Sequence, residues 1–527
     1  MCYHQGMAAT ATPTPFANEP FTDFTRDTER HAMQEALRLV HSQFGKRYQL
    51  IIGGERYSAK EYFQSVNPAR KGEVIGYFCK TGIEQAEQAV QAALRTFDAW
   101  SQVDPGKRAD VLFKAAVIMR RRKHELAAWL IYEVGKSWVE ADVDVSEAID
   151  FCEFYRREML RLAEDQPLTR MAGERNELVY IPLGVGAVIP PWNFPLAILC
   201  GMTAAAVVTG NTVVLKPSSD APTIAYKFME VLEEAGAPPG VVNFITGPGG
   251  EIGDYIVQHP KVRFVAFTGS KEVGLGISEK AAHPQKGQIW IKRAVLEMGG
   301  KDAILVSSDA DLDAAVEGVA AAAFGFQGQK CSACSRAIVE APVYDAFLEK
   351  LVARVRTIKV GDPQDAGTWM GPVINEKAFK KIMDYVQIGR GEGRLAVGGE
   401  PGPADGWYVM PTVVADVDPK ARLAQEEIFG PVLAVIKASD FEDGLRIAND
   451  TDFGLTGAVY TTSPRHVEQA KKRFHVGNLY INRKCTGAMV GAHPFGGFNM
   501  SGTDSKAGGR DYLLLFTQAK TISQKVS

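Results

Sequence analysis

A cysteine and a glutamate stand in sequence surroundings that suit covalent chemistry. Cys331 lies in Gly-Gln-Lys-Cys-Ser-Ala-Cys after a predicted helix, and Glu297 precedes Gly299-Gly300-Lys301. A thiol becomes a nucleophile when it is partly exposed and a neighbour favours the thiolate, as Lys330 or nearby backbone N–H groups can do. A carboxylate in an apolar pocket can act as a base near neutral pH. Composition alone favours a plainer interpretation, a core thiol and a surface carboxylate.

Two further patterns suggest metal or redox chemistry, but neither has the residues that such chemistry needs. Cys331 and Cys334 form a C-x-x-C pair, yet no second cysteine or histidine pair stands nearby to complete a zinc site, and a thioredoxin-like pair sits near the first strand of a small domain. Asp309–Asp313 begins like a calcium loop, but Ala314 and Ala320 stand where glycine and glutamate are needed. We therefore predict no metal site, and an acidic first helical turn after Asp309.

Length and charge narrow the class of protein. The 527 residues exceed what one core supports, so at least two lobes are expected. The chain has 59 Lys and Arg residues and 62 Asp and Glu residues, so its net charge is close to zero. It lacks the excess of positive charge that binding to nucleic acid or to an anionic membrane requires. Seven cysteines without regular spacing indicate free thiols in a reducing compartment. No signal peptide or membrane span is evident, so we expect a cytoplasmic protein.

The elements that must position these residues alternate between strands and helices. The stretch 1–25 is expected to be a tail, and Thr81–Glu84 has the pattern of a capping box that opens a helix. Long amphipathic helices are predicted over 106–163, interrupted at Gly135. From Val185 onward short apolar runs alternate with helical segments, which predicts a parallel, doubly wound sheet. A second such series begins at Ala303, so two α/β lobes are expected to meet near residue 298.

Two turns in the first series suit a nucleotide. Phe267-Thr-Gly-Ser270 joins a strand to a helix, where backbone can approach a pyrophosphate, although it is not G-x-G-x-x-G. Lys216 ends another parallel strand, at the edge where ligands bind. Each turn is, by itself, equally compatible with an ordinary strand-to-helix connection.

Taken together, the motifs resemble those of the NAD(P)-dependent aldehyde dehydrogenase superfamily over about residues 45–520. Seven occur in one order: Pro191-Trp-Asn-Phe-Pro195, Lys216-Pro-Ser218, Phe267-Thr-Gly-Ser270, Glu297-Met-Gly-Gly-Lys301, Gly328-Gln-Lys-Cys331, Glu427-Ile-Phe-Gly-Pro431 and Pro494-Phe-Gly-Gly497. Within the superfamily, Cys331-Ser332, Arg483–Ala488 and Ser501–Gly509 are most similar to the L-glutamate γ-semialdehyde dehydrogenase branch, also called 1-pyrroline-5-carboxylate dehydrogenase.

The resemblance implies a fold and a division of the chain. The fold is α/β, with a Rossmann-type NAD-binding lobe, a second α/β catalytic lobe and a β-arm for oligomerisation. The implied boundaries are 1–44 for the N-terminal tail and helix, 45–164 with 183–297 for the NAD-binding domain, 298–500 for the catalytic domain, and 165–182 with 501–527 for the arm and C-terminal segment.

The resemblance also assigns roles. Cys331 is the implied nucleophile, Asn193 with the Cys331 backbone N–H the oxyanion hole, and Glu297 the base that activates water. The positions that match the family's cofactor contacts are Ile189, Trp192, Lys216, Ser219, Gly269, Ser270, Val273, Glu427 and Phe429. Ser219 departs from the glutamate usual in NAD-preferring members, so NAD is expected with weak discrimination against NADP. The presence of Glu297 argues against a CoA-acylating enzyme.

The implied substrate is L-glutamate 5-semialdehyde, oxidised to L-glutamate in the second step of proline catabolism. The residues implied to bind it are Phe194, Ser332, Gly487, Ala488, Phe495 and Glu147. Three alternatives remain open: an aldehyde dehydrogenase for another semialdehyde or aliphatic aldehyde, a non-enzymatic protein with this fold, and a cysteine hydrolase. The expected partners are a small-molecule substrate, other copies of the chain assembled from dimers, and a proline dehydrogenase, with no nucleic acid or membrane.

Overall fold

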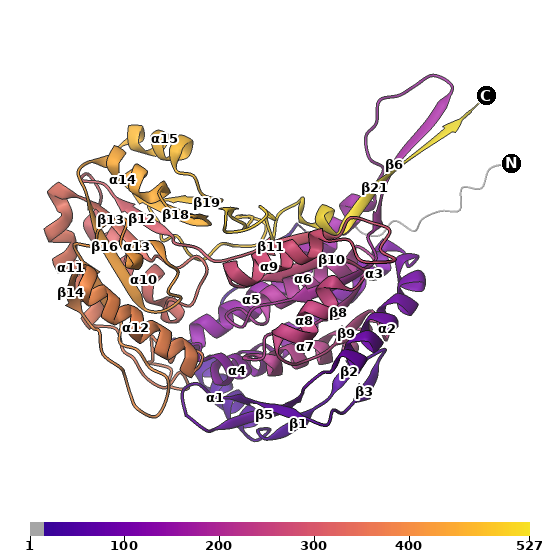
Figure 1. The fold of residues 1–527 in the computed structure, drawn as a ribbon, viewed down its shortest axis with the longest axis horizontal. Helices are drawn as coiled ribbons and strands as arrows, with labels where there is room; N and C mark the ends of the chain where they lie inside the picture. Colours follow the sequence, from indigo (N-terminus) through magenta and orange to yellow (C-terminus); the bar gives the residue numbers. More distant parts are fainter. Residues whose placement is uncertain (1–14, 527) are drawn as a thin grey trace.

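A computed structural model describes residues 15–526 of the chain (Figure 1). Cys2, which is expected to be a structural thiol, and most of the expected N-terminal tail lie outside these residues. Two α/β lobes stand side by side, and a thin two-stranded arm projects from one of them (Figure 1). None of the helices in residues 15–526 has the length and apolar character needed to cross a bilayer.

The first lobe is built on a seven-stranded sheet. Five strands run parallel, and β2 and β3 add an antiparallel edge that the sequence pattern did not predict. In spatial order the strands are β11 (Arg293–Glu297), β10 (Val262–Thr268), β7 (Val185–Ile189), β8 (Thr212–Leu215), β9 (Val242–Phe244), β2 (Leu50–Ile52) and β3 (Glu55–Tyr57).

Helices cover both faces of this sheet, as expected of a doubly wound sheet. On one face the core contains α2 (Ile83–Ser101), α8 (Gly249–Gln258) and α9 (Lys271–Ala282). On the other it contains α3 (Pro105–Arg121), α4 (Lys123–Val134), α5 (Trp138–Ala163), α6 (Ala197–Val208) and α7 (Pro222–Glu234), with α1 (Asp27–His41) outside them.

The second lobe repeats the plan with a seven-stranded sheet that is parallel except at its β14 edge. Its strands, in spatial order, are β14 (Arg394–Val397), β15 (Thr412–Ala415), β16 (Val432–Ala438), β13 (Arg336–Glu340), β12 (Ala303–Val306), β18 (Thr456–Tyr460) and β19 (Asn478–Ile481). Its helices are α10 (Leu312–Phe324), α11 (Tyr344–Arg356), α12 (Glu376–Glu392), α13 (Arg422–Gln425), α14 (Phe441–Asn449) and α15 (Pro464–Arg473).

The projecting arm pairs distant parts of the chain. Strand β6 (Glu174–Pro182) runs antiparallel to β21 (Thr517–Lys525), and most of their side chains are exposed or half-buried. Smaller sheets join β1 (Lys46–Tyr48), β5 (Val74–Cys79) and β4 (Tyr62–Val66), and β17 (Phe453–Gly454) with β20 (Phe498–Asn499).

One local prediction is wrong, and one is met. The N-cap of α2 is Gly82 and not Thr81: the Gln85 side chain accepts from the Gly82 N–H at 2.9 Å, while the Thr81 hydroxyl accepts from Thr246 N–H. The predicted break between helices occurs at Gly135, whose φ of 70° is left-handed and favours glycine.

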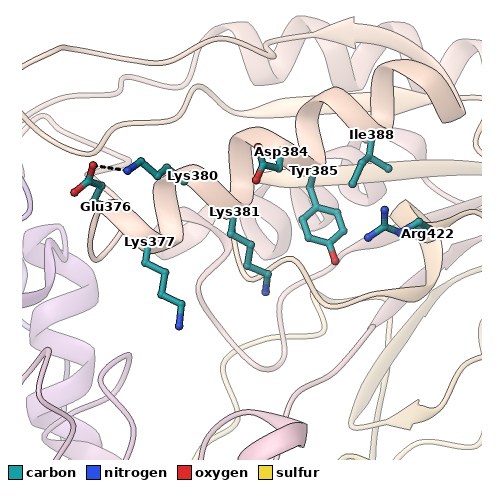
Figure 2. A pocket seen from close by; sticks show the side chains of 8 residues that line it. All are labelled: Glu376, Lys377, Lys380, Lys381, Asp384, Tyr385, Ile388 and Arg422. Carbon is teal, nitrogen blue, oxygen red and sulfur yellow. Dashed lines mark ion pairs between the residues drawn. The ribbon is translucent and has the colours of Figure 1, made fainter. Parts of the chain in front are cut away.

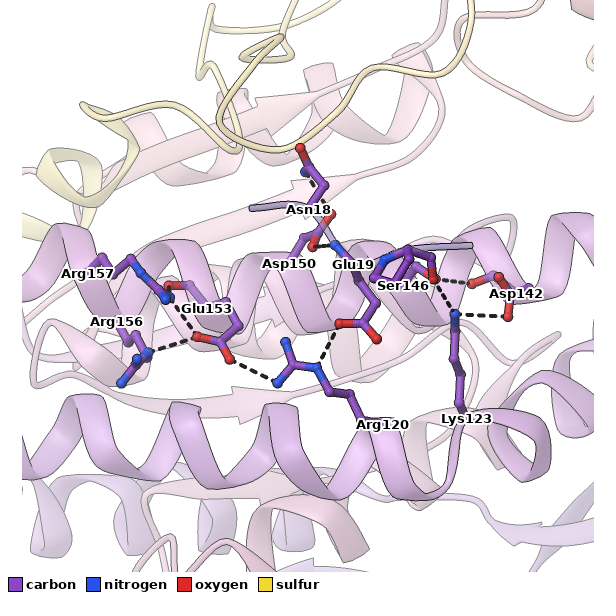
Figure 3. A network of polar contacts seen from close by, with 11 residues as sticks. Asn18, Glu19, Arg120, Lys123, Asp142, Ser146, Asp150, Glu153, Arg156 and Arg157 are labelled. Carbon is purple, nitrogen blue, oxygen red and sulfur yellow. Dashed lines mark hydrogen bonds and ion pairs between the residues drawn. The ribbon is translucent and has the colours of Figure 1, made fainter. Parts of the chain in front are cut away.

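Helix α5 is the longest in the described chain and is held by an N-terminal strap, residues 16–24 (Figure 3). The Asn18 amide donates to Asp150 on α5 and to the Val490 carbonyl, at 2.8 and 3.0 Å. Lys123 at the start of α4 donates to the Pro20 carbonyl at 2.9 Å and pairs with Asp142 of α5 at 3.1 Å. The strap therefore ties α4 and α5 together.

Candidate active site

The carboxyl ends of three neighbouring strands bring together the residues expected to bind a cofactor. Ile189 ends β7, Lys216 follows β8, and Gly269 and Ser270 lie between β10 and α9. The Ser270 hydroxyl caps α9 by accepting from the Val273 N–H at 3.4 Å. Parallel strands present their carboxyl ends to ligands, and a helix N-terminus there suits a phosphate group.

Lys216 is a buried cation with little local compensation. Its side chain is 4% exposed, and its ammonium donates to the adjacent Pro217 carbonyl at 3.4 Å. Burial lowers its pKa to about 8. Such a group suits hydroxyl acceptors, for example those of a ribose.

Ser219 and Asp220 are already engaged in hydrogen bonds within the protein. The Ser219 hydroxyl donates to the Gly247 carbonyl at 3.1 Å, and the Asp220 carboxylate accepts from the Asn375 amide at 3.0 Å. Burial raises the pKa of Asp220. Residue 219 therefore places a neutral hydroxyl, not a carboxylate, beside the β8 edge.

The loop after β7 connects the two lobes. The Trp192 ring meets the ring of Phe429 from the second lobe, with centroids 5.5 Å apart. Asn193 is buried, and its amide donates to the Gln329 carbonyl at 3.1 Å, two residues before Cys331. The amide has a second N–H, so it can still donate to a developing oxyanion.

The thiol follows a strained turn. Phe326 and Gln327 have left-handed φ values of 49° and 58°. The Gln327 amide donates to the carbonyls of Gly135 and Pro372 at 3.0 and 2.7 Å, which holds the strained turn in place. Strain of this kind persists only where the surroundings hold it, and it is common at functional sites. The turn delivers Cys331, which is neither fully buried nor exposed.

Two glycines allow the Glu297 loop to pass between Cys331 and Glu427. A Cβ at Gly299 would overlap the Glu427 carboxylate, and one at Gly300 would overlap the Cys331 carbonyl. The Gly300 N–H donates to Glu427 at 3.1 Å. Close approach of backbone thus accounts for both glycines of the Glu-Met-Gly-Gly sequence.

Segments from both lobes meet at a cavity of about 110 Å³. It holds Cys331 and Glu297 together with every residue expected to bind substrate. Its lining residues are Val143, Glu147, Phe151, Phe194, Ile198, Gly201, Met202, Thr268, Glu297, Lys330, Cys331, Ser332, Gly487, Ala488, Phe495, Ala507 and Tyr512. The cofactor positions and Asn193 are not among the lining residues.

The cavity raises the pKa of its acids. Burial raises the pKa of Glu297 to about 8, partly offset by the Lys506 ammonium. Burial raises the pKa of Glu147 to about 8 as well, and the Asp144 carboxylate adds to the effect. Neither glutamate has an ion-pair partner within residues 15–526. Both are therefore poised to change protonation near neutral pH.

Lys330 does not play the part expected from its place in the sequence. Its ammonium pairs with Glu140 of α5 at 2.7 Å. Burial raises the pKa of the Cys331 thiol well above its usual value, and the carboxylates of Glu297 and Asp302 raise it further. The resting thiol is therefore protonated near neutral pH, and Lys330 is committed elsewhere.

The residues expected to bind a carboxylate share one wall of the cavity. Ser332 is buried beside Cys331, and its carbonyl accepts from Thr456 and Cys485 at 3.4 and 3.3 Å. Gly487 has a φ of 78° and precedes Ala488 in the loop after β19. The arrangement leaves the Ser332 hydroxyl and this loop's backbone available to a ligand.

Some residues around the cavity were not predicted from the sequence, although a helical spacing could have revealed them. Val143 and Phe151 lie four residues before and after the predicted Glu147 on α5, and all three line the cavity. Lys136 and Asp144, which form an ion pair with no exposed side-chain surface, were not predicted either. No motif points to that pair.

A second hollow, of about 730 Å³, lies on the surface of α12 (Figure 2). Its lining is charged, and some of these charges are held in ion pairs: Lys380 pairs with Glu376 at 2.7 Å, and Arg422 pairs with Glu426 at 2.9 Å. It contains no cysteine, and no cluster of three or more His, Cys, Asp or Glu side chains in residues 15–526 is arranged to hold a metal.

The chain belongs to the aldehyde dehydrogenase family, whose model matches residues 56–522. The predicted α/β fold is confirmed by a solved betaine aldehyde dehydrogenase from Staphylococcus aureus in complex with NAD+, with a TM-score of 0.87 at 30% identity over 94% of this chain and 98% of that one. Asn193, Glu297 and Cys331 stand within the motifs that carry the family resemblance.

Two proteins that are more similar to this chain than the betaine aldehyde dehydrogenase share one name. The 1-pyrroline-5-carboxylate dehydrogenase of Geobacillus thermodenitrificans is 58% identical over 97% of this chain and 99% of its own length. A solved 1-pyrroline-5-carboxylate dehydrogenase from Thermus with bound NAD has a TM-score of 0.96 at 50% identity, covering 98% and 100% of the two chains. The chain also matches 53% of the length of proline utilization A from Bdellovibrio bacteriovorus, at 44% identity and a TM-score of 0.96.

Proposed function

We propose that this chain oxidises L-glutamate γ-semialdehyde, the open form of 1-pyrroline-5-carboxylate, to L-glutamate with NAD as electron acceptor. The observation that carries the proposal is one cavity that holds a thiol and a buried acid together with an unpaired glutamate and a free hydroxyl. The names of the Geobacillus and Thermus relatives support this substrate.

In the first step the Cys331 thiol loses its proton to solvent water, and the sulfur bonds to the aldehyde carbon and forms a thiohemiacetal. The carbonyl oxygen gains negative charge as its π bond opens. The free N–H of the Asn193 amide and the Cys331 backbone N–H stabilise this oxyanion, because donors fixed in advance need no reorganisation. The Asn193 amide is held by the Gln329 carbonyl of the nucleophile loop, so the loops that carry the two donors are hydrogen-bonded to each other.

The residues at the strand edge fit a nicotinamide dinucleotide. Lys216, a buried ammonium without an acidic partner in the described chain, would bind ribose hydroxyls, and the N-terminus of α9 with Ser270 would bind the phosphates. Glu427 and Phe429 would bind the cofactor from the second lobe. The bound cofactor supplies the acceptor for the hydrogen and two electrons that leave the substrate carbon.

The acyl group that remains on Cys331 is a thioester, which water must cleave. Glu297 in its carboxylate form takes a proton from that water as the water oxygen bonds to the acyl carbon. The Cys331 sulfur then leaves, and glutamate is released. A pKa near 8 suits this work, because general-base catalysis is most effective when the pKa lies near the operating pH.

Recognition of the amino-acid group falls to the remaining polar groups. The Ser332 hydroxyl and the N–H groups at Gly487 and Ala488 bind the α-carboxylate, while the Glu147 carboxylate binds the α-ammonium. Phe194 and Phe495 pack on the aliphatic chain between the aldehyde and the amino-acid group. A site built for these groups rejects plain alkyl aldehydes, since its polar atoms would stay unpaired.

Cofactor choice rests on residue 219. The Ser219 hydroxyl offers neither a carboxylate for the ribose hydroxyls nor repulsion of a 2′-phosphate, and Asp220 is engaged with Asn375. We therefore expect NADP to be used as well, with a small preference for NAD. The variant Ser219→Glu should sharpen that preference by lowering kcat/KM for NADP alone.

We extend the proposal to assembly and surroundings. The exposed β6–β21 arm suits pairing with a second copy, so we expect dimers and further association of dimers. The match to proline utilization A supports a proline-oxidising partner that supplies the substrate. A reactive thiol and six free described cysteines suit a reducing compartment, the cytoplasm.

The test compares glutamate semialdehyde with its des-amino analogue and with propanal, each with NAD and with NADP, by near-UV absorbance of reduced nicotinamide. Glutamate semialdehyde should exceed the analogue in kcat/KM by about 10–100-fold, the worth of one buried charged contact. Equal values would favour the alternative, an enzyme for other semialdehydes.

A further inference from the structure

A buried ion pair beside the active site has no part in the steps above. The Lys136 ammonium lies 3.0 Å from the Asp144 carboxylate, and neither side chain has any exposed surface. Isolated buried charges are costly, and a buried pair seldom stabilises a fold more than apolar residues would. Stability alone therefore does not account for the pair.

Asp144 connects α5 to the loop that carries Asn193. Its second carboxylate oxygen accepts from the Ala197 N–H at 2.7 Å, at the first residue of α6. Only Phe194, Pro195 and Leu196 separate that bond from Asn193. The carboxylate thus fixes where the oxyanion loop ends.

Lys136 connects the same point to the loop that carries the thiol. Its ammonium lies 3.8 Å from the ring centroid of Phe194 and 4.6 Å from that of Phe326. Phe194 follows Asn193 directly, and Phe326 begins the left-handed turn that leads to Cys331. A cation is attracted to aromatic faces, most strongly where water is excluded.

We propose that Lys136 and Asp144 are positioning residues: they set the distance between the oxyanion donor and the nucleophile by holding both loops against α5. This inference rests on the proposed roles of Cys331 and Asn193. Neither charge touches the substrate. The pair acts through Phe194, Phe326 and the start of α6.

A second ion pair, between Lys123 at the start of α4 and Asp142 of α5, provides the control (Figure 3). Lys123 and Asp142 are 3.1 Å apart and nearly buried, but their other side-chain hydrogen bonds go to Pro20 and Thr22 of the N-terminal strap and not to the loops that carry Asn193 and Cys331. Asp142 and Asp144 are two residues apart and so point to different sides of α5. Loss of either lysine leaves a buried aspartate without its ion-pair partner. Only the loss of Lys136 should disturb the loops that carry Asn193 and Cys331.

The experiment compares Lys136→Met with Lys123→Met. The first readout is hydrolysis of p-nitrophenyl acetate, in which the thiol displaces nitrophenolate and water then releases acetate, so neither substrate recognition nor cofactor is involved. The second is aldehyde oxidation. Lys136→Met should lower both kcat values by roughly 10–100-fold, as a misplacement of about 1 Å can do, with the KM for NAD unchanged. Lys123→Met should stay within about twofold of wild type.

The double variant Lys136→Met/Asp144→Asn covers a failure of the single variant to fold. It removes both charges and keeps an amide oxygen for the Ala197 N–H, and it should still lose ester hydrolysis. Wild-type kcat in either variant, or an equal loss in Lys123→Met, would overturn the inference.

Two other results would bear on the proposed function instead. Ester hydrolysis that survives Cys331→Ala would refute the assigned nucleophile. A wild-type enzyme that does not oxidise glutamate semialdehyde would refute only the substrate.

Discussion

The two hollows of this protein differ in size and in the state of their charges. The surface hollow on α12 is several times larger, and Lys380, Glu376 and Arg422 of its lining are held in exposed ion pairs. The cavity between the lobes is small, and it keeps two glutamates without cationic partners in the described chain and a thiol whose pKa is raised by burial. Burial without compensation, and not volume or charge, therefore distinguishes the place where chemistry is expected.

The largest effect is expected when the Cys331 thiol in the cavity is removed. Cys331→Ala should abolish NADH formation, a loss of more than ~10⁴-fold, because no bond to the aldehyde carbon can form. Cofactor should still bind, since its contacts lie at the strand edge, and quenching of Trp192 fluorescence on titration with NADH would report this. Turnover retained in the variant would move the reaction away from this cavity.

Glu297→Gln tests the base and should cost about 10²–10⁴-fold in steady-state rate. Acylation should persist, so a burst of NADH precedes slow release. In the wild type the release rate should rise as pH increases through about 8, because the raised pKa keeps the carboxyl protonated below that value. The variant should lack this rise. A steady rate without a burst would contradict the role.

Glu147→Gln should affect recognition more than chemistry. We expect kcat/KM for glutamate semialdehyde to fall about 10–100-fold as the contact to the ammonium weakens, mostly through KM. The des-amino analogue, which has no ammonium, serves as the control substrate and should be used at least as well as by the wild type. An equal fall for both substrates would show that Glu147 supports the fold and not the amine.

The smallest effect is expected in the surface hollow on α12. Lys377→Ala with Lys380→Ala should change kcat and KM by less than about twofold, because exposed pairs contribute little and no reacting group lies there. Thermal unfolding of the double variant, followed by circular dichroism, should match the wild type within about two degrees. A large kinetic change would mean that the hollow takes part in catalysis.

Much of the fold could be predicted from the sequence, because its signals are local. Short apolar runs between Gly and Pro breaks mark the parallel strands, and the predicted alternation of strands and helices from Val185 onward is seen in the first lobe. The antiparallel edge strands β2 and β3 were not predicted as part of the first sheet, since so short a strand carries no information about its partner.

The residues of the site also fall into those that could be predicted from the sequence and those that could not. The motifs placed Cys331, Glu297 and the cofactor positions in sequence. The structure brings Cys331 and Glu297 to one cavity, and it places Ile189, Lys216, Gly269 and Ser270 at one edge of the first sheet. Lys136 and Asp144 could not be found, because a charged residue in a turn and another on a helix look like solvated groups. The prediction for Lys330 was wrong for a related reason: its neighbour in sequence is Cys331, but its partner in space is Glu140.

The arm has a consequence for how the protein is made. Strand β21 is synthesised about 330 residues after β6, so at ~5–20 residues per second β6 waits roughly 20–70 s without its partner. During that time its backbone N–H and C=O groups can pair with any other exposed strand. The nascent chain is therefore most prone to misassembly just before its last strand appears, and the same arm that suits docking of a second finished copy must first be shielded on the ribosome.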